Sequence, residues 1–230
     1  MHSSPNTVAL QAVANALGSM RAEVVFVGGA TIGLYGAAKI SPESRPTDDV
    51  DCIIELASYG DFAQLEESLR KKGFRNDAES GVQIRWIWQE YTVDVMPTDE
   101  RILGFSNQWY TSGIHTAVAY ELPDGSSIRI LDAPHLLGTK FCAMQNRGDD
   151  LRYDSDFEDI LYVLTYRTRI LEEVAESQPA LRLYLAAASA QLLARQDIRA
   201  VLDAAKDRDA SVAGLLEKLG YVAQLGQIQQ

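Results

Sequence analysis

Hydrophobic residues change their spacing along the chain, from short continuous or alternating runs to helical periodicity. The short runs predict strands at 23–27, 49–56, 82–88, 91–96, 117–120 and 127–131. Helical spacing predicts helices at 5–20, 30–38, 61–72, 134–146, 156–175, 179–194, 197–206 and 210–219. We therefore expect an α/β domain with a mixed β-sheet, residues 1–131, followed by a helical bundle, residues 132–230.

The charge balance narrows the classes of function. The chain has 230 residues, 47% of them hydrophobic, and carries 21 Lys and Arg against 32 Asp and Glu, a net charge of −11. This length is sufficient for one domain or two small ones, each with a buried core. The acid excess argues against a protein that binds nucleic acid through a broad basic face, although it does not exclude a local basic cleft.

The sequence also restricts the location of the protein and its metal ligands. The first residues contain no basic segment followed by an apolar run, and the longest apolar stretch, 183–194, is too short to span a membrane. We therefore expect a cytoplasmic protein without membrane contact. Two cysteines cannot form a disulfide framework, and the three histidines are scattered, so any metal ligands should be carboxylates.

A pair of aspartates opens the second predicted strand. Asp49 and Asp51 lie two positions apart before an apolar run, so both carboxylates should point from one face of the strand while Val50 packs on the other. Oxygen ligands of this kind suit Mg²⁺. Asp94, in the alternating strand 91–96, is the candidate for a third ligand; the alternative is a solvent-exposed residue on a half-buried strand.

Two glycines end the first predicted strand. At Gly28 and Gly29 the absence of side chains would let a phosphate approach the backbone at the start of a helix, although an ordinary tight turn is an equal alternative. Neither the Walker pattern nor the Gly-x-Gly-x-x-Gly pattern is present.

Together these segments resemble the nucleotidyltransferase superfamily and, more narrowly, its AbiEii-type branch, which includes toxins of toxin–antitoxin and phage-defence systems. The resemblance covers residues 24–164. It rests on Phe26-Val27-Gly28-Gly29-Ala30-Thr31, Arg45-x-Thr47-x-Asp49-Val50-Asp51, Asp94, Leu137-Gly138-Thr139-Lys140-Phe141-Cys142-Ala143, Arg147 and Asp156-x-x-Asp159-Ile160.

The resemblance implies roles for individual residues. Two Mg²⁺ or Mn²⁺ ions would be held by Asp49, Asp51 and Asp94, with Asp94 bridging a metal to the attacking oxygen or acting as its base. The nucleotide would be bound by Gly28, Gly29, Thr31, Arg45, Thr47, Lys140 and Asp159. Lys140 would contact a phosphate as a fourth catalytic residue.

Other roles are open for the residues of the helical half. Lys140 lies beside an apolar stripe, so a salt bridge to an aspartate at the edge of the core, or a side chain that reaches solvent, is the alternative. Asp156 and Asp159 could orient Lys140 or Arg147, or cap the helix that follows.

The implied reaction is transfer of a nucleoside monophosphate from ATP or another NTP to an acceptor hydroxyl, which could belong to a tRNA end, a protein or a small molecule. An antitoxin partner is possible. The alternatives are a catalytically inactive nucleotide-binding or interaction protein with the same fold, and an unrelated α/β domain whose acidic pair is accidental. The segment 40–46 could fold over the nucleotide or be inert.

Overall fold

The computed structural model describes residues 4–36, 41–147 and 150–226. The chain divides into two compact units. Unit 1 comprises Met1–Gly33 and Glu43–Asp132, and unit 2 comprises Leu34–Pro42 and Ala133–Gln230. Unit 2 thus includes a segment that lies far upstream of the predicted boundary at residue 131. That the helical part supplies Lys140 to a shared site stays a prediction.

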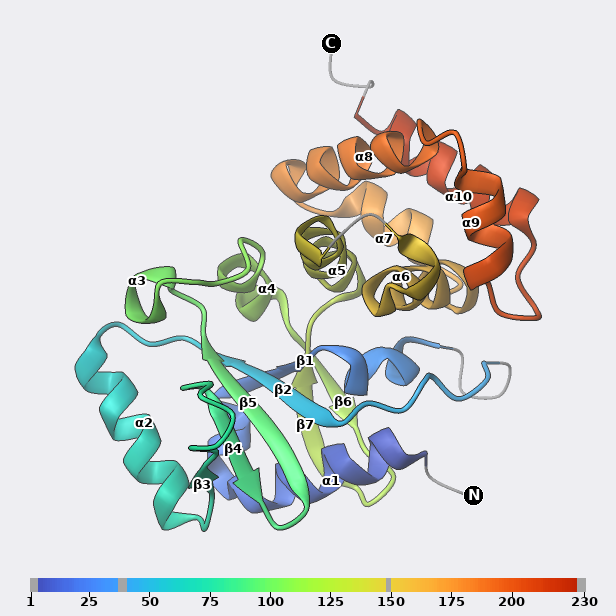
Figure 1. Cartoon of the computed structure of the whole chain (residues 1–230). Coiled ribbons are helices and arrows are strands. Elements are labelled where there is room, and N and C mark those ends of the chain that lie inside the picture. The colour runs from blue at the N-terminus through green and yellow to red at the C-terminus, as the bar shows by residue number, and fades with distance from the viewer. Residues whose placement is uncertain (1–3, 37–40, 148–149, 227–230) are drawn as a thin grey trace. The chain divides into compact units, whose positions relative to one another are not determined.

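A seven-stranded sheet forms the centre of unit 1, in the order β3-β4-β5-β2-β1-β7-β6 (Figure 1). Its strands are β1 (Val24–Val27), β2 (Asp49–Ile54), β3 (Arg75–Asn76), β4 (Arg85–Trp88), β5 (Tyr91–Pro97), β6 (Val118–Glu121) and β7 (Ser127–Ile130). The pairs β2–β5 and β1–β7 are parallel, and the other neighbours are antiparallel. The predicted mixed sheet is confirmed, although the strand expected over 82–88 begins only at Arg85.

The register of four central strands forms a lateral row that positions the site. Val27 of β1 lies opposite Asp51 of β2, which lies opposite Asp94 of β5, which in turn lies opposite Arg85 of β4. Residues in register share a face of the sheet, so the side chains of this row point the same way. The intervening residues are buried on the other face, where α1 (Pro5–Leu17) packs against β2 and β5.

The helices of unit 1 begin where local caps allow them to. Ser4 accepts a hydrogen bond from the Thr7 amide at the start of α1, and Ser58 accepts one from the Asp61 amide at the start of α2. The other helical segments are η1 (Gly18–Ala22), α2 (Tyr59–Lys71), α3 (Glu100–Leu103), α4 (Tyr110–Thr116) and η2 (Gly29–Tyr35), whose last two residues belong to unit 2.

Two expectations for these helices are corrected. The helix expected over 30–38 is the 3₁₀ helix η2; residues 37 and 38 lie outside the described part of the chain. The short helices α3 and α4 were not predicted, because four and seven residues are too few to display a helical period.

Unit 2 is helical, as predicted. It contains α5 (Ala133–Arg147), η3 (Leu151–Tyr153), α6 (Ser155–Tyr166), α7 (Ile170–Glu176), α8 (Pro179–Leu193), α9 (Ile198–Ala205) and α10 (Val212–Gln224). Helices α5 and α10 each pack against several of the others. No helix among the described residues is long and apolar enough to cross a lipid bilayer.

The single helix expected over 156–175 is wrong, because the chain breaks it into α6 and α7. Arg167 has an extended backbone at the end of α6, and its guanidinium binds both carboxylate oxygens of Glu173 at 3.0 and 2.7 Å. Apolar residues keep their spacing across the break, so the pattern alone did not reveal it.

Candidate functional site

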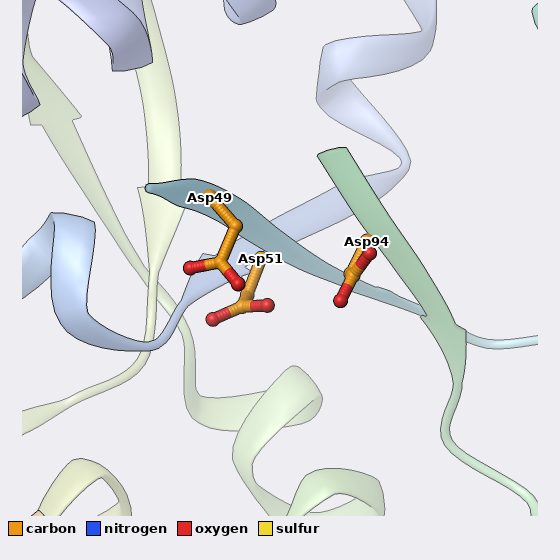
Figure 2. A group of neighbouring side chains, drawn as sticks. All are labelled: Asp49, Asp51 and Asp94. Atoms are coloured by element: carbon orange, nitrogen blue, oxygen red, sulfur yellow. The ribbon is translucent and has the colours of Figure 1, made fainter. Parts of the chain in front are cut away.

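Three aspartates converge on one face of the sheet in unit 1. Asp49, Asp51 and Asp94 each offer a carboxylate oxygen, and these oxygens lie within 4.8 Å of one another (Figure 2). They meet because β2 and β5 are parallel neighbours in register. Asp94 is buried, whereas the side chain of Asp49 is 37% exposed. Carboxylates this close repel one another unless a cation lies among them, and a set made only of oxygen donors suits a hard divalent ion.

The turn after β1 lies directly against this acidic triad. Gly28 has a φ of 73°, and a Cβ at this position would overlap the carboxylate of Asp51. Glycine is therefore required both by the backbone conformation and by the close approach to Asp51.

The neighbouring glycine contacts the loop before β2. A Cβ on Gly29 would overlap the methyl group of Thr47 and lie 3.2 Å from Nη2 of Arg45. The predicted glycine turn is thus flanked by a carboxylate at one residue and by a guanidinium at the next.

Asn6 of α1 holds that loop in place and was missed by the sequence analysis. Its side-chain amide donates to Ser44 Oγ at 3.2 Å and to the Arg45 carbonyl at 2.8 Å, and its Oδ1 accepts from the Thr47 amide at 3.1 Å. The Thr47 hydroxyl donates to the Asp49 carbonyl at 3.0 Å, which links the loop to the first residue of β2. An asparagine in the first turn of a helix carries no sequence signal for such a role.

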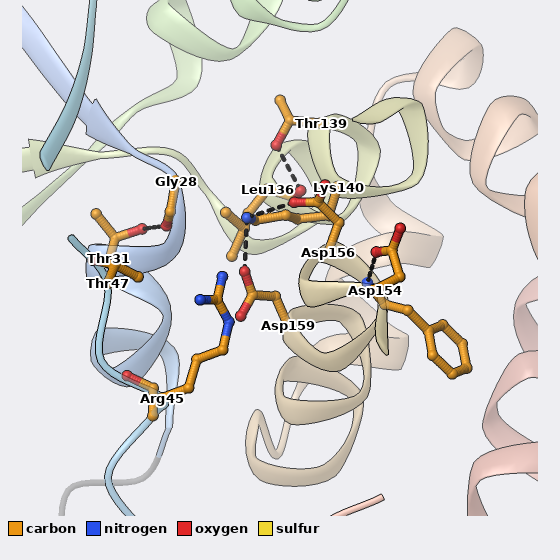
Figure 3. A network of polar contacts seen from close by, with 12 residues as sticks. Gly28, Thr31, Arg45, Thr47, Leu136, Thr139, Lys140, Asp154, Asp156 and Asp159 are labelled. Atoms are coloured by element: carbon orange, nitrogen blue, oxygen red, sulfur yellow. Dashed lines mark hydrogen bonds and ion pairs between the residues drawn. The ribbon is translucent and has the colours of Figure 1, made fainter. Parts of the chain in front are cut away.

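The contact with the nucleotide that the resemblance implies for Thr31 stays a prediction. Its side chain is fully buried, and its hydroxyl donates to the Gly28 carbonyl at 2.9 Å (Figure 3). In this conformation Thr31 supports the turn from within.

Arg85 completes the row and was also missed. Its Nε donates to Asp94 Oδ1 at 2.9 Å, its Nη2 donates to Asp94 Oδ2 at 2.8 Å, and Nη2 lies 3.7 Å from Asp49 Oδ2. The hydrogen bond to Asp94 raises the pKa of Arg85 above its ordinary value, so the guanidinium is cationic. In the sequence, Arg85 alternates with apolar residues of the strand expected over 82–88, but this pattern does not identify the strand that pairs with it.

The negative potential of the triad is also seen at Cys52. Burial is the main reason that the pKa of this thiol is well above its ordinary value, and the charges of Asp51 and Asp94 raise the pKa further. Cys52 is therefore an inert core thiol.

A second acidic cluster lies within unit 2. Lys140 of α5 binds Asp156 Oδ1 at 2.9 Å and Asp159 Oδ2 at 2.7 Å, both from α6 (Figure 3). At most 9% of any of these side chains is exposed. Burial acts to lower the pKa of Lys140, but the charges and hydrogen bonds of Asp159 and Asp156 outweigh it and raise the pKa.

The structure therefore shows the alternative in which Lys140 forms a salt bridge to aspartates. Asp156 and Asp159 orient this lysine. The helix cap is provided by Asp154, which accepts a hydrogen bond from the Phe157 amide at 2.8 Å. A cap formed by Asp156 or Asp159 is therefore wrong. The phosphate contacts predicted for Lys140 and Asp159 stay predictions, and the side chain of Arg147 lies outside the described part.

Comparison with known proteins bears on the fold. No family model and no curated protein matches the sequence. The structure is similar to the crystal structure of an antigenic nucleotidyltransferase-like protein from Paracoccidioides brasiliensis, with a TM-score of 0.53 and 18% sequence identity. The match covers 90% of this chain and 96% of that chain. The predicted nucleotidyltransferase-like fold is thereby confirmed, and the acidic triad could bind a metal ion.

Proposed function

We propose that this protein is a metal-dependent nucleotidyltransferase that transfers a nucleoside monophosphate from an NTP to an acceptor hydroxyl, with pyrophosphate as the leaving group. The observation that carries the proposal is the convergence of three carboxylates from β2 and β5 beside the turn at Gly28. Phosphoryl chemistry of this kind needs positioning and charge neutralisation more than a protein nucleophile.

The three aspartates would hold two divalent ions, Mg²⁺ or Mn²⁺. When bound, such ions activate the acceptor oxygen and offset the charge of the phosphates. Asp94, from the strand next to the Asp49 and Asp51 pair, would be the third carboxylate that holds the ion by which the acceptor oxygen is activated. A role for Asp94 as the base belongs to the same proposal.

The backbone of the glycine turn would receive the phosphates. Gly28 and Gly29 let the backbone of the turn pack closely against Asp51 and Thr47, and the guanidinium of Arg45 beside Gly29 would supply a positive charge for a polyphosphate such as that of ATP. Thr47 would act through the loop that it anchors, and Thr31 would keep the turn in shape.

The acceptor is proposed as a class only. A tRNA end, a protein or a small molecule would each offer a hydroxyl, and the net charge of −11 makes a large polyanion the least favourable of the three. The same proposal includes membership of the AbiEii-type branch and a place in a toxin–antitoxin or phage-defence system. It also includes an antitoxin partner and a cytoplasmic location.

One observation favours a second candidate, a nucleotide-binding or interaction protein without turnover. Lys140, which the resemblance assigns to a phosphate, is engaged by two aspartates in this structure. An enzyme whose phosphate-binding lysine stays engaged in this way would bind a nucleotide without transferring it.

Labelled nucleotides distinguish the two candidates. We would incubate the protein with each labelled NTP, Mg²⁺ or Mn²⁺, and a cell extract that is then separated into RNA, protein and small molecules. The wild type should label one fraction, and the double variant Asp49→Asn/Asp51→Asn should lose at least about a thousandfold in rate, since metal ions contribute several kcal/mol to such reactions.

A matched control is available in the chain. Asp207 and Asp209 form another Asp-x-Asp pair, both exposed and in unit 2. The double variant Asp207→Asn/Asp209→Asn should keep the wild-type rate. Nucleotide binding without label in any fraction would favour the second candidate, and the absence of both binding and label would contradict the two proposals together.

A further inference from the structure

Arg85 is the charged residue of the acidic site to which the proposed function gives no part. It lies on β4, opposite Asp94 in the lateral row, and the side chains of the row share one face of the sheet. The position is therefore built into the sheet and does not depend on a flexible loop.

The guanidinium engages both oxygens of Asp94. Its Nε and Nη2 donate to Oδ1 and Oδ2 at 2.9 and 2.8 Å, a bidentate arrangement that is among the strongest between side chains. Asp49, by contrast, lies 3.7 Å from the same Nη2. A divalent ion that binds to Asp94 would have to share these oxygens with Arg85 or displace it.

The charges of the site are consistent with competition between Arg85 and a divalent ion for Asp94. The carboxylates of Asp49, Asp51 and Asp94 and the guanidinium of Arg85 together carry a net charge of −2, which a single divalent ion balances. A second ion would leave the site positive unless a further anion arrives. A nucleoside triphosphate supplies that anion, and its phosphates are also ligands that a guanidinium binds in bidentate fashion.

Arg85 also has room to change partners. Its side chain is 29% exposed, whereas that of Asp94 is 9% exposed. The guanidinium can therefore move toward a ligand on the solvent side while the carboxylate stays on its strand.

We propose that Arg85 competes with divalent ions for Asp94 and exchanges this carboxylate for a phosphate of the nucleotide, so that the second ion binds together with the nucleotide. This inference rests on the proposed function, because it needs a polyphosphate at the site. Arg85 is then a positioning residue that sets the order of binding.

The test measures the binding of Mn²⁺ alone, and the electron paramagnetic resonance signal of the free ion reports how much Mn²⁺ stays unbound. Arg85→Gln should bind Mn²⁺ about tenfold more tightly than the wild type, because it removes a positive charge a few ångströms from the ion. Arg75→Gln is the matched control, since Arg75 is an exposed arginine on the neighbouring strand β3, and it should bind as the wild type does. Addition of a nonhydrolysable NTP analogue should raise the bound Mn²⁺ of the wild type from one ion to two per chain, as the charge balance requires.

Arg85→Lys keeps the experiment decisive if Arg85→Gln does not fold. Lysine retains the charge but cannot bind both oxygens in the planar fork of arginine, so the gain in affinity should be about two- to threefold. Circular dichroism establishes that each variant is folded.

The outcomes separate the two proposals. If Asp49→Asn/Asp51→Asn abolishes Mn²⁺ binding but neither Arg85 variant binds more tightly than the wild type, the role of Arg85 is overturned and the proposed metal site stands. Two ions bound to the wild type before the nucleotide is added would overturn it as well. If the wild type binds no Mn²⁺, or if the aspartate variant binds it equally well, both proposals fail.

Discussion

The two acidic clusters of the protein use carboxylates in opposite ways. In unit 1, three aspartates meet on a sheet face with one guanidinium among them, and Asp49 is 37% exposed. In unit 2, two aspartates enclose one lysine, and each of the three side chains is at most 9% exposed. The first cluster has ligand oxygens that a cation from solution can reach, whereas the second brings its own cation and excludes water.

The difference teaches that charge alone does not mark a functional site. Both clusters carry more negative than positive charge, yet burial makes the second one a part of the helical packing, because it joins α5 to α6. Exposure and a neighbouring glycine turn make the first one suitable for a ligand. Removal of charge should therefore destabilise unit 2 and leave unit 1 folded but inactive.

The largest effect on stability is expected for Lys140→Met. The variant leaves two buried carboxylates without their cation, which should cost about 3–5 kcal/mol of the free energy of unfolding. The measurement is urea unfolding followed by far-UV circular dichroism, which reports the helices. The control is Lys206→Met, also in unit 2, whose partner Asp203 is 72% exposed; it should cost less than about 1 kcal/mol.

The three tryptophans sharpen this result. All of them, Trp86, Trp88 and Trp109, lie in unit 1, so tryptophan fluorescence reports that unit. The comparison between the clusters would be contradicted if the aspartate variants of unit 1 lost as much stability, measured by tryptophan fluorescence, as Lys140→Met loses.

An intermediate effect is expected for Asn6→Ala. The variant removes three hydrogen bonds to the loop beside Gly29, one of them buried and two part-buried, at a cost of about 1–3 kcal/mol. Tryptophan fluorescence during urea unfolding measures it. Asn15→Ala, on the exposed side of the same helix, should change stability by less than about 0.5 kcal/mol; an equal effect of the two would contradict the role of Asn6.

The smallest effect, of opposite sign, is expected for Asp49→Asn. Without divalent ions the variant should be as stable as the wild type or more stable by up to about 1 kcal/mol, because it relieves repulsion within the triad. Added Mn²⁺ should raise the Tm of the wild type more than that of the variant, since binding to the folded state stabilises it. A loss of stability in metal-free buffer would indicate that the triad is a structural cluster like that of unit 2.

Alternation along single strands accounts for the part of the site that the sequence predicted. Asp49, Asp51 and Asp94 were placed on strand faces by the residues around them, and the turn at Gly28 was placed by the end of an apolar run. These features depend on nearest neighbours in the chain. They can therefore be predicted without knowledge of the strand order.

Partners from other elements could not be predicted in the same way. Arg85 meets Asp94 only because β4 pairs with β5, and Lys140 meets its aspartates only because α5 packs against α6. For Lys140 the sequence left open a contact with a phosphate, a salt bridge to an aspartate and a side chain that reaches solvent. Asn6 gave no signal at all, because its three hydrogen bonds all go to a loop far along the chain.

The lateral row from Val27 to Arg85 has a consequence for how the protein is made. Three pairs of strands must find their register before this row is complete, and the pairs β1–β2 and β2–β5 join segments that are more distant in the sequence, an arrangement that slows folding. The two-residue turn at Gln89 and Glu90 sets the last of these registers. One residue inserted between that turn and Asp94 would shift the aspartate to the opposite face of its strand. Binding of a divalent ion by all three carboxylates would thus require that β2 and β5 have reached their native register.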